Sequence, residues 1–309
     1  MVVGRFAPSP SGLMHLGNAR TALLAWLDVR SRGGRMLLRV DDLDRERCRP
    51  AWAAAIRDDL RWLGLDWDQE TAPQSTRDGA YREALEQLTR AGHAYGCHCT
   101  RRDLALASAP HARGRRYPGT CARLSAAERD ARAAAGRRPA VRVRMPAAPV
   151  AVRDRLHGEL VESVAEVTGD IVCRRSDGLF AYQLAVVVDD AADGVTDVVR
   201  GVDLLASTPR QVALAGLLEV AVPAHGHVPL ALGPDGARLS KRHGPIALAD
   251  LRAAGVGPEA LVGALAASAG LAEPGARVMP AALLSGFRLE HVGRAPVFLD
   301  GRSLLRVAS

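Results

Sequence analysis

The stretch that decides the fold reads RFAPSPSGLMHLGN and runs from Arg5 to Asn18. An apolar run at residues 2–6 leads into a loop rich in proline and serine, and apolar positions then recur at helical spacing from Asn18 onward. A second apolar run covers residues 36–40 and ends at the acidic loop 41–44. Strand, helix and strand in this order predict a βαβ unit with parallel strands. Ligands of such sheets bind outside the carboxyl ends of the strands, where both loops lie.

The rest of the chain repeats this alternation of strands and helices with one interruption. Residues 93–165 hold three closely spaced cysteines and an arginine-rich stretch, and they predict a subdomain inserted between two halves of the sheet. The expected fold class is therefore α/β, a Rossmann-type parallel sheet split by an insertion and followed by a small helical region. The predicted divisions are residues 1–92 for the first half of the main domain, 93–165 for the insertion, 166–235 for the second half, 236–290 for a polar loop with the helical region, and 291–309 for a C-terminal tail.

Composition excludes several classes of protein. The 309 residues are 48% hydrophobic and 24% charged, which is typical of globular proteins and excludes a disordered chain. Apolar runs such as residues 184–188 are far shorter than the roughly 20 residues that cross a bilayer, and no signal segment is visible. Five cysteines, three of them between positions 97 and 121, fit reduced thiols better than disulfides. We therefore expect a cytoplasmic protein with no membrane partner.

The charge balance favours a polyanionic partner. Lysine and arginine number 41 against 34 aspartates and glutamates, which gives a net charge of +7. Because neutralised phosphates release condensed counterions, such an excess favours nucleic acid, and a solvated basic face is the alternative. Lys241 is the only lysine in the chain. A lysine kept in so arginine-rich a chain is a candidate for a task that requires a compact ammonium group.

Two short motifs, far apart in the sequence, fit the binding of a polyphosphate. His15 and Gly17 lie at the expected start of a helix, where free backbone N–H groups form an anion site and glycine allows close approach. The alternative is that His15 only caps the helix. Ser240 and Lys241 lie in the polar loop RLSKR at residues 238–242, where an ammonium group suits the charge on a leaving polyphosphate. The alternative for this loop is an ordinary basic turn.

Together these motifs resemble the two signatures of class I aminoacyl-tRNA synthetases. HIGH appears as HLGN at residues 15–18, and KMSKS appears as RLSKR at residues 238–242. The surrounding sequence is similar to the glutamyl branch over about residues 4–270, and within that branch it resembles the glutamyl-Q tRNA(Asp) synthetases. These are short paralogues that lack the anticodon-binding domain of full glutamyl-tRNA synthetases. The stretches that carry the resemblance are ARTAL at residues 19–23, RVDDLDRE at 39–46, FAYQLAVVVDD at 180–190 and VRGVDLL at 199–205.

The resemblance implies a ligase with a two-step reaction. The enzyme activates L-glutamate with ATP to glutamyl-adenylate, and a hydroxyl group of queuosine at the wobble position of tRNA(Asp) then takes the glutamyl group. The implied partners are L-glutamate, ATP with Mg²⁺ and tRNA(Asp) carrying queuosine, and a monomer is expected. Two alternatives stay open. One is a truncated glutamyl-tRNA synthetase that charges a tRNA 3′ end, and the other is a catalytically inactive zinc-containing RNA-binding protein.

The resemblance also assigns residues to the two small substrates. Asp41 matches the position of the family's contact to the α-amino group of glutamate, where the family usually has the longer glutamate side chain. Taken singly, Tyr182 fits a core residue and Arg200 fits a structural ion pair. The implied catalytic residues are His15 and Lys241, which stabilise charge on the polyphosphate. The implied L-glutamate site is Arg5, Ala7, Ser9, Asp41, Tyr182 and Arg200, and the implied ATP site is His15, Gly17, Asn18, Ser240 and Lys241.

Three cysteines form a candidate metal site in the predicted insertion. Cys97, Cys99 and Cys121 lie close together in the sequence, and three thiolates suit a tetrahedral zinc ion. Chemistry alone leaves the fourth ligand open, because histidines lie nearby at positions 93, 98 and 111. The resemblance selects Tyr117, so the implied ligands of one Zn²⁺ are Cys97, Cys99, Tyr117 and Cys121. The alternative is a group of buried cysteines without a metal.

Overall fold

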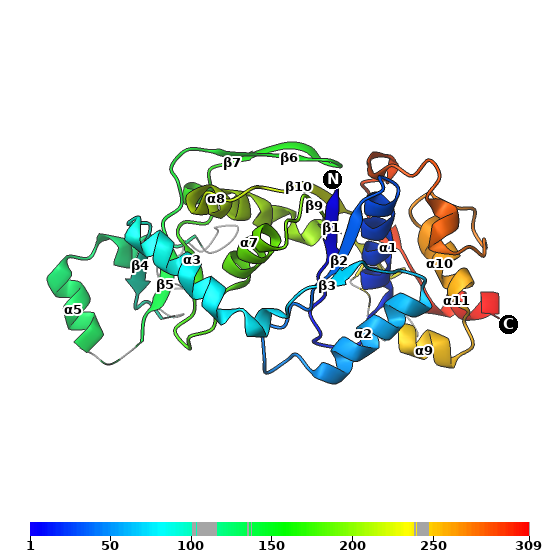
Figure 1. Ribbon diagram of the computed structural model, residues 1–309, viewed down its shortest axis with the longest axis horizontal. Helices are drawn as coiled ribbons and strands as arrows, with labels where there is room; N and C mark the ends of the chain where they lie inside the picture. Colours follow the sequence, from blue (N-terminus) through cyan, green and yellow to red (C-terminus); the bar gives the residue numbers. More distant parts are fainter. Residues whose placement is uncertain are drawn as a thin grey trace.

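A seven-stranded sheet forms the centre of the computed structural model, which describes residues 1–100, 103, 116–134, 136, 138–237, 239 and 247–308. The strand order is β3-β2-β1-β9-β10-β6-β7, and every neighbouring pair is parallel except the β6–β7 hairpin (Figure 1). This confirms the predicted α/β class, with β1, α1 and β2 as the βαβ unit. The strands of the sheet are β1 (Val3–Phe6), β2 (Arg35–Leu38), β3 (Gln69–Glu70), β6 (Val150–Asp154), β7 (Gly158–Glu162), β9 (Asp197–Gly201) and β10 (Ala224–Val228).

Helices cover both faces of this sheet. On one face α1 packs against β1 and β9 and is covered by α10, whereas α7 and α8 lie on the other face (Figure 1). Each face has its own buried apolar cluster, one around Leu23 and Leu27 of α1 and one around Leu184 of α7 and Leu214 of α8. The helices are α1 (Leu16–Arg30), α2 (Pro50–Trp62), α3 (Asp78–Arg90), α5 (Ala126–Ala134), α6 (Val164–Val167), α7 (Tyr182–Ala192), α8 (Thr208–Leu218), α9 (Leu248–Ala253), α10 (Pro258–Ala267) and α11 (Gly301–Ala308). Short 3-10 helices lie at Gln74–Thr76, Thr120–Arg123, Val202–Ser207, Pro280–Leu283 and Leu289–His291.

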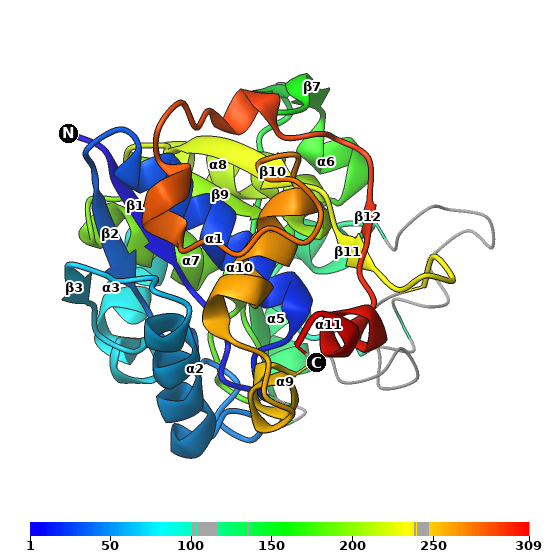
Figure 2. The same cartoon turned by 90° about the vertical axis from the view of Figure 1, so that its right-hand side faces the viewer.

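Close packing of α1 on the sheet depends on a glycine in β1. A Cβ atom at Gly4 would collide with a methyl group of Val29, so only glycine lets the helix approach this strand. Figure 2 shows α10 lying over the outer side of α1, with α9 and α11 near its lower end. The helix is therefore enclosed between the sheet and the helical region, and its first turn is held next to the carboxyl end of β1.

A second, three-stranded sheet carries the cysteine cluster toward one end of the molecule (Figure 1). Its strands are β4 (Ala94–Cys97), β5 (Ala140–Val143) and β8 (Ile171–Arg174), and they pair antiparallel. These pairings differ from the predicted divisions in two places. The β6–β7 hairpin falls within the predicted insertion, residues 93–165, but extends the large sheet, whereas β8 falls outside it but pairs with β5. Local patterns identify strands, but tertiary packing selects their partners, so the sequence did not locate this boundary.

The C-terminal segment packs back onto the rest of the protein. β12 (Val297–Phe298) pairs in parallel with β11 (Ala231–Leu232), and α11 packs against α9 and α10. Leu299 and Leu304 are buried in the apolar cluster on the α1 face. As far as it is described, the segment predicted as a tail, residues 291–309, is therefore part of the helical region.

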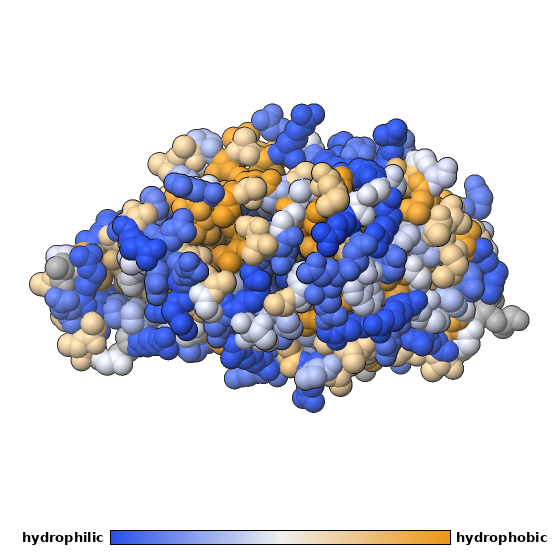
Figure 3. Space-filling model, in the orientation of Figure 1, coloured by the Kyte–Doolittle hydropathy of each residue, from blue (hydrophilic) through white to orange (hydrophobic). Residues whose placement is uncertain are grey.

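The surface is mostly hydrophilic on the face seen in Figure 3, with an apolar area over α7 and α8. Arginines on the surface pair with carboxylates, for example Arg57 with Glu70 and Arg45 with Asp78. Within the described ranges, the protein contains no helix whose length and apolar character would let it span a bilayer.

The order of the strands creates a crevice between β1 and β9. From β1 the chain continues toward β2 on one side, and from β9 it continues toward β10 on the other side. The connections after these two neighbouring strands therefore diverge at the carboxyl edge of the sheet. Open α/β sheets bind their ligands at such a switch point.

Candidate active site and metal centre

A cleft of about 710 Å³ opens at this edge of the sheet. It is formed by the end of β1 and the loop after it, the start of α1, the loop after β2, the start of α7 and the end of β9. Ser240 and Lys241 lie outside the described residues, although Leu239 beside them lines the cleft. The other residues predicted to contact the substrates all line it: Arg5, Ala7, Ser9, His15, Gly17, Asn18, Asp41, Tyr182 and Arg200.

The first turn of α1 is capped by His15. Its Nδ1 accepts hydrogen bonds from the backbone N–H groups of Gly17 and Asn18 at 3.1 and 3.4 Å. In return, the side-chain oxygen of Asn18 accepts from the N–H of His15 at 3.4 Å. The helix cap, which the sequence left as an alternative, is therefore present. Two of the N–H groups expected to be free for an anion are bonded to His15 instead.

This cap determines which nitrogen of His15 carries the proton. Because Nδ1 accepts hydrogen bonds from N–H groups, the neutral ring is protonated at Nε2. Desolvation lowers the pKa of His15, which favours the neutral form at pH 7. The ring can therefore donate one hydrogen bond through Nε2 to a phosphate oxygen in the cleft. Capping and phosphate binding are compatible because they use different nitrogens.

A buried network of arginines and aspartates lies beside the cleft. Arg39 is fully buried and donates through Nε to Oδ1 of Asp41 at 2.9 Å and through Nη1 to Oδ1 of Asp190 at 2.8 Å. The same oxygen of Asp190 accepts from Nε of Arg5 at 3.2 Å. Asp193 is a further partner of Arg39, at 3.2 Å. One buried guanidinium group thus connects Asp41 with Arg5.

Among the described residues, the network contains more carboxylates than guanidinium groups. Among its carboxylates only that of Asp41 lines the cleft. Burial raises the pKa of Asp41 to about 6, although Arg39 and Arg5 act in the opposite direction. A cation bound beside Asp41 would balance the excess negative charge. The carboxylates belong to Asp41, Asp189, Asp190 and Asp193, and the guanidinium groups belong to Arg5, Arg39 and Arg77.

Arg200, at the end of β9, lies in surroundings with an excess of positive charge. Its side chain is 5% exposed, and its guanidinium group donates to Nε2 of His227, the hydroxyl groups of Tyr182 and Thr208, and the amide oxygen of Gln211. Among the described residues no carboxylate lies within ion-pair distance of it. Desolvation lowers its pKa, but a guanidinium group stays charged at neutral pH. A buried cation without a carboxylate partner, at the wall of a cleft, can bind an anion.

Arg5 provides a second guanidinium group to the same cleft. Within the described part of the chain its hydrogen bonds use only Nε, and the residue lines the cleft. The sequence indicated both cleft arginines but not the groups that hold them, Arg39, Asp190 and His227. Charged or polar residues inside otherwise apolar strands and helices were the available signal, because such residues are buried only when they have partners.

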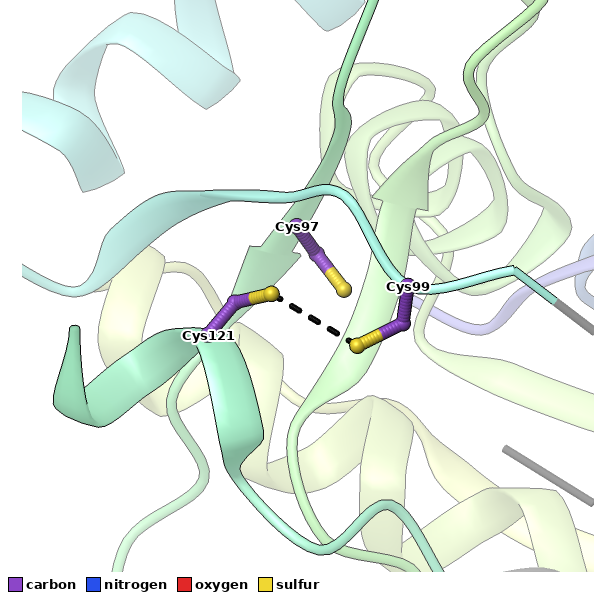
Figure 4. Close-up of side chains that lie close together, drawn as sticks. All are labelled: Cys97, Cys99 and Cys121. Atoms are coloured by element: carbon purple, nitrogen blue, oxygen red, sulfur yellow. Dashed lines mark hydrogen bonds between the residues drawn. The ribbon is translucent and has the colours of Figure 1, made fainter. Parts of the chain in front are cut away.

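The three predicted cysteines meet at the small sheet (Figure 4). Cys97 ends β4, Cys99 follows two residues later, and Cys121 lies in the 3-10 helix after it. Their sulfur atoms all lie within 4.8 Å of one another, and those of Cys99 and Cys121 are 3.5 Å apart. Tetrahedral zinc with Zn–S bonds of 2.3 Å separates its sulfurs by roughly 3.8 Å, so the spacing fits one ion. No histidine nitrogen in the described ranges joins this group, and His111 lies outside them.

Tyr117 contributes an oxygen to the same cluster. Its hydroxyl oxygen accepts from Sγ of Cys97 at 3.4 Å and from the backbone N–H of Cys121 at 2.9 Å, and it lies 4.0 Å from Sγ of Cys99. Arg142 stacks on the tyrosine ring, 3.7 Å from its centre, and donates through Nε to Sγ of Cys97 at 3.3 Å. Three thiols and a phenol therefore surround a position suited to a metal ion, and Arg142 offsets part of their negative charge when they are deprotonated.

Known proteins show the same combination of sequence and fold. Residues 1–277 match the family described as tRNA synthetases class I (E and Q), catalytic domain. The chain is 50% identical to the glutamyl-Q tRNA(Asp) synthetase of Symbiobacterium thermophilum over 98% of each chain, and 50% identical to that of Nocardia farcinica over 98% of this chain and 94% of the relative. A crystal structure of a glutamate tRNA ligase from Elizabethkingia meningosepticum in complex with its amino acid matches with a TM-score of 0.85 and 27% identity, covering 98% of this chain and 68% of the ligase. The chain therefore belongs to the class I tRNA synthetases (E and Q), in the branch that contains the glutamyl-Q tRNA(Asp) synthetases.

Proposed function

We propose that this protein activates L-glutamate with ATP and transfers the glutamyl group to queuosine in tRNA(Asp). The observation that carries the proposal is the charge arrangement of the cleft, which offers Asp41 to an ammonium group and Arg5 and Arg200 to carboxylates. Glutamate brings one ammonium group and two carboxylates, so it satisfies all three. Glutamine lacks the second carboxylate and leaves a buried guanidinium group unpaired, which disfavours it strongly. The queuosine acceptor is the substrate that the names of the half-identical relatives indicate.

The first step forms glutamyl-adenylate. An oxygen of the α-carboxylate of glutamate attacks the α-phosphorus of ATP, the bond from that phosphorus to the bridging oxygen breaks, and pyrophosphate leaves with the electron pair. We assign His15 and Lys241 to this step, because the Nε2–H of the imidazole and the ammonium group stabilise charge on the phosphates. Gly17, Asn18 and Ser240 complete the ATP site. ATP brings Mg²⁺, which offsets phosphate charge, and no protein ligand is assigned to it.

The second step transfers the acyl group. A hydroxyl oxygen of the queuosine ring attacks the carbonyl carbon of the adenylate, the bond to the phosphate oxygen breaks, and AMP and a proton are released. Ala7, Ser9 and Tyr182 complete the glutamate site and hold the adenylate during this attack. The net charge of +7 favours a polyanionic acceptor such as tRNA. Because one chain carries every residue assigned to the cleft, we propose that it acts as a monomer, in a reducing cytoplasm.

We also propose that one zinc ion is held by Cys97, Cys99, Tyr117 and Cys121. The donor set is thiol-rich, as zinc prefers, and contains no oxygen cage suited to magnesium or calcium. None of the four residues lines the cleft, so the ion has a structural role. It would tie the end of β4 to the segment around Thr120–Arg123 and so order the small sheet.

The location of the transferred glutamate tests the function directly. The protein is incubated with ATP, labelled glutamate and bulk bacterial tRNA, and the RNA is then digested to nucleosides. We expect label on a nucleoside of the anticodon loop, and none when the tRNA comes from cells that do not make queuosine. Label on the 3′-terminal adenosine would identify a truncated charging enzyme instead. RNA binding without glutamate-dependent pyrophosphate exchange would favour an inactive RNA-binding protein.

A further inference from the structure

A line of three buried side chains crosses the sheet behind the cleft. Arg200 on β9, His227 on β10 and Asp154 at the end of β6 lie on three neighbouring strands and are 5%, 0% and 2% exposed. Nε of Arg200 lies 3.0 Å from Nε2 of His227, and Nδ1 of His227 lies 2.6 Å from Oδ2 of Asp154. Arg200 and His227 are also direct partners in the strand register. Of the three, only Arg200 lines the cleft.

The direction of each hydrogen bond in this line is determined by chemistry. The guanidinium group of Arg200 can only donate, so Nε2 of His227 must accept and carries no proton. The proton of the neutral imidazole therefore lies on Nδ1, which donates it to Asp154. Burial lowers the pKa of His227, in line with a neutral ring. The line thus requires an ionised carboxylate at its far end.

Backbone groups hold Asp154 in that state. Its Oδ1 accepts from the N–H groups of Leu156 and His157, both at 2.9 Å, which leaves Oδ2 for His227. Although burial acts in the opposite direction, the hydrogen bonds from His227 and from these N–H groups lower the pKa of Asp154 to about 2. The carboxylate therefore stays charged and keeps the proton of His227 on Nδ1.

We propose that Asp154 and His227 are positioning residues that hold Arg200 ready for the substrate carboxylate. His227 binds Nε of Arg200, while Thr208 and Gln211 bind Nη2 at 2.9 and 2.7 Å. These contacts direct Nη1 toward Tyr182, which also lines the cleft. Because all direct partners of the guanidinium group in the described part of the chain are uncharged, its positive charge stays available to the ligand. This inference rests on the proposed function, since it assumes that Arg200 binds glutamate.

A purely structural role is the competing explanation. Asp154 and His227 also join the β6–β7 hairpin to the central sheet, and residues of this kind contribute to stability without touching a substrate. A structural contact would affect folding, and both substrates would be affected together. A positioning contact would affect the binding of glutamate and leave the binding of ATP unchanged.

The decisive variant is Asp154→Asn, which keeps the shape and reverses one hydrogen bond. The amide oxygen stays on the two backbone N–H groups, so the amide NH₂ group faces His227 and donates to Nδ1. The imidazole proton must then move to Nε2, where it meets the N–H of Arg200. We expect the KM for glutamate in ATP–pyrophosphate exchange, and the Kd for glutamate in calorimetry, to rise about 10- to 100-fold, as for a buried polar group left unpaired. We expect the KM for ATP to change by less than about twofold.

His227→Gln is the matched control. The glutamine side-chain oxygen occupies the place of Nε2 and accepts from Arg200 whatever stands at position 154. We expect this variant to retain glutamate binding within about threefold of wild type. We also expect Asp154→Asn to cause no further loss of glutamate binding when it is added to His227→Gln, because glutamine has no ring proton that could move from one nitrogen to the other. Thermal denaturation of each variant reports any change in folding.

Three outcomes would overturn the inference. The first is unchanged glutamate binding in Asp154→Asn, and the second is an equal rise of KM for both substrates in that variant. The third is that Asp154→Asn weakens glutamate binding as much in the His227→Gln protein as in wild type. If Asp154→Asn does not fold, the comparison moves to His227→Gln and His227→Leu, and equal KM values for glutamate in those two variants would overturn it. A failure of the proposed function is distinct, because wild-type protein would then show no glutamate-dependent exchange.

Discussion

Arg39 and Asp41 form a buried ion pair beside the cleft, with Nε of Arg39 2.9 Å from Oδ1 of Asp41. Neither side chain is more than 7% exposed. The aspartate is one methylene group shorter than the glutamate expected in the family, and Arg39 holds it in place. Because Arg39 also binds Asp190, and Asp190 binds Arg5, one side chain connects the proposed contact for the ammonium group with a proposed contact for a carboxylate. Replacement of Arg39 should therefore affect both.

Arg39→Met should destabilise the fold and abolish glutamate binding. It leaves the aspartates of the network with only two guanidinium groups, and removal of one partner of a buried ion pair costs about 3–5 kcal/mol. Urea denaturation measures this change in the free energy of unfolding. Arg57→Met is the matched control, because Arg57 pairs with Glu70 on the surface and such pairs contribute only about 0–1 kcal/mol. Equal urea midpoints of unfolding for Arg39→Met and Arg57→Met would contradict a stabilising role of the buried network.

Glutamate binding should weaken in mild acid. Burial raises the pKa of Asp41 to about 6, so its carboxylate takes up a proton as the pH falls through that value and no longer attracts the α-ammonium group. We expect the KM for glutamate to rise as the pH is lowered from about 7.5 to about 5.5. Asp41→Asn should have a high KM that no longer follows this titration. A wild-type KM that is constant over this range would rule out ionised Asp41 as the contact.

The same ionisation should have the opposite effect on stability. The folded-state pKa of Asp41 lies above its unfolded value of about 3.9, so the folded protein binds this proton more tightly. The ionised carboxylate therefore lowers the stability above pH 6, and this cost is relieved as the pH falls from about 6 toward about 4. We therefore compare the free energy of unfolding of Asp41→Asn with that of wild type at two pH values. The variant should be less stable relative to wild type at pH 5 than it is at pH 7.5. Urea denaturation of both proteins at the two pH values measures the difference.

Two substitutions at His15 separate its role as a helix cap from its proposed contact to ATP. Asparagine is a good N-cap, so His15→Asn should keep the stability of α1, whereas His15→Ala should cost about 1 kcal/mol. Neither side chain presents an N–H where Nε2 lies. Both variants should therefore lower the kcat of pyrophosphate exchange by about a hundredfold. If His15→Asn retained the wild-type kcat, the imidazole would serve only as the cap.

Zinc analysis of two variants should identify the fourth ligand. Tyr117→Phe removes the hydroxyl group that contacts Cys97 and Cys99, so we expect weaker zinc binding in a competition with a chromogenic chelator. His98→Ala removes a nearby imidazole and should leave the affinity unchanged. Wild type should contain about one zinc per chain. Weaker zinc binding in His98→Ala than in Tyr117→Phe would instead assign the fourth ligand to His98.

Local patterns in the sequence were sufficient for the order of the main elements. The apolar run before the Pro-Ser loop became β1, and the helical spacing that follows became α1, because neighbouring residues dictate backbone conformation through side-chain periodicity. The same motifs indicated the residues that line the cleft, from Arg5 to Arg200. The roles of these residues came from the resemblance to the synthetase family. The geometry of the sheet explains only why they lie together, because the loops after parallel strands meet at one edge.

Pairing between distant segments was decided only by the tertiary structure. The β6–β7 hairpin joined the large sheet, and Asp154, the last residue of β6 before the turn, thereby reached His227. Likewise, Asp190 of α7 reached both Arg5 and Arg39, although about 150 residues or more separate them in the chain. No local pattern encodes such contacts, because a buried charge is stable only beside a partner that the folded backbone delivers to it. The sequence by itself determined the residue types of the site and the strands that carry them. Only the folded chain decided how these charges are balanced: the described network around Asp41 has an excess of carboxylates, whereas Arg200 has no carboxylate partner among the described residues.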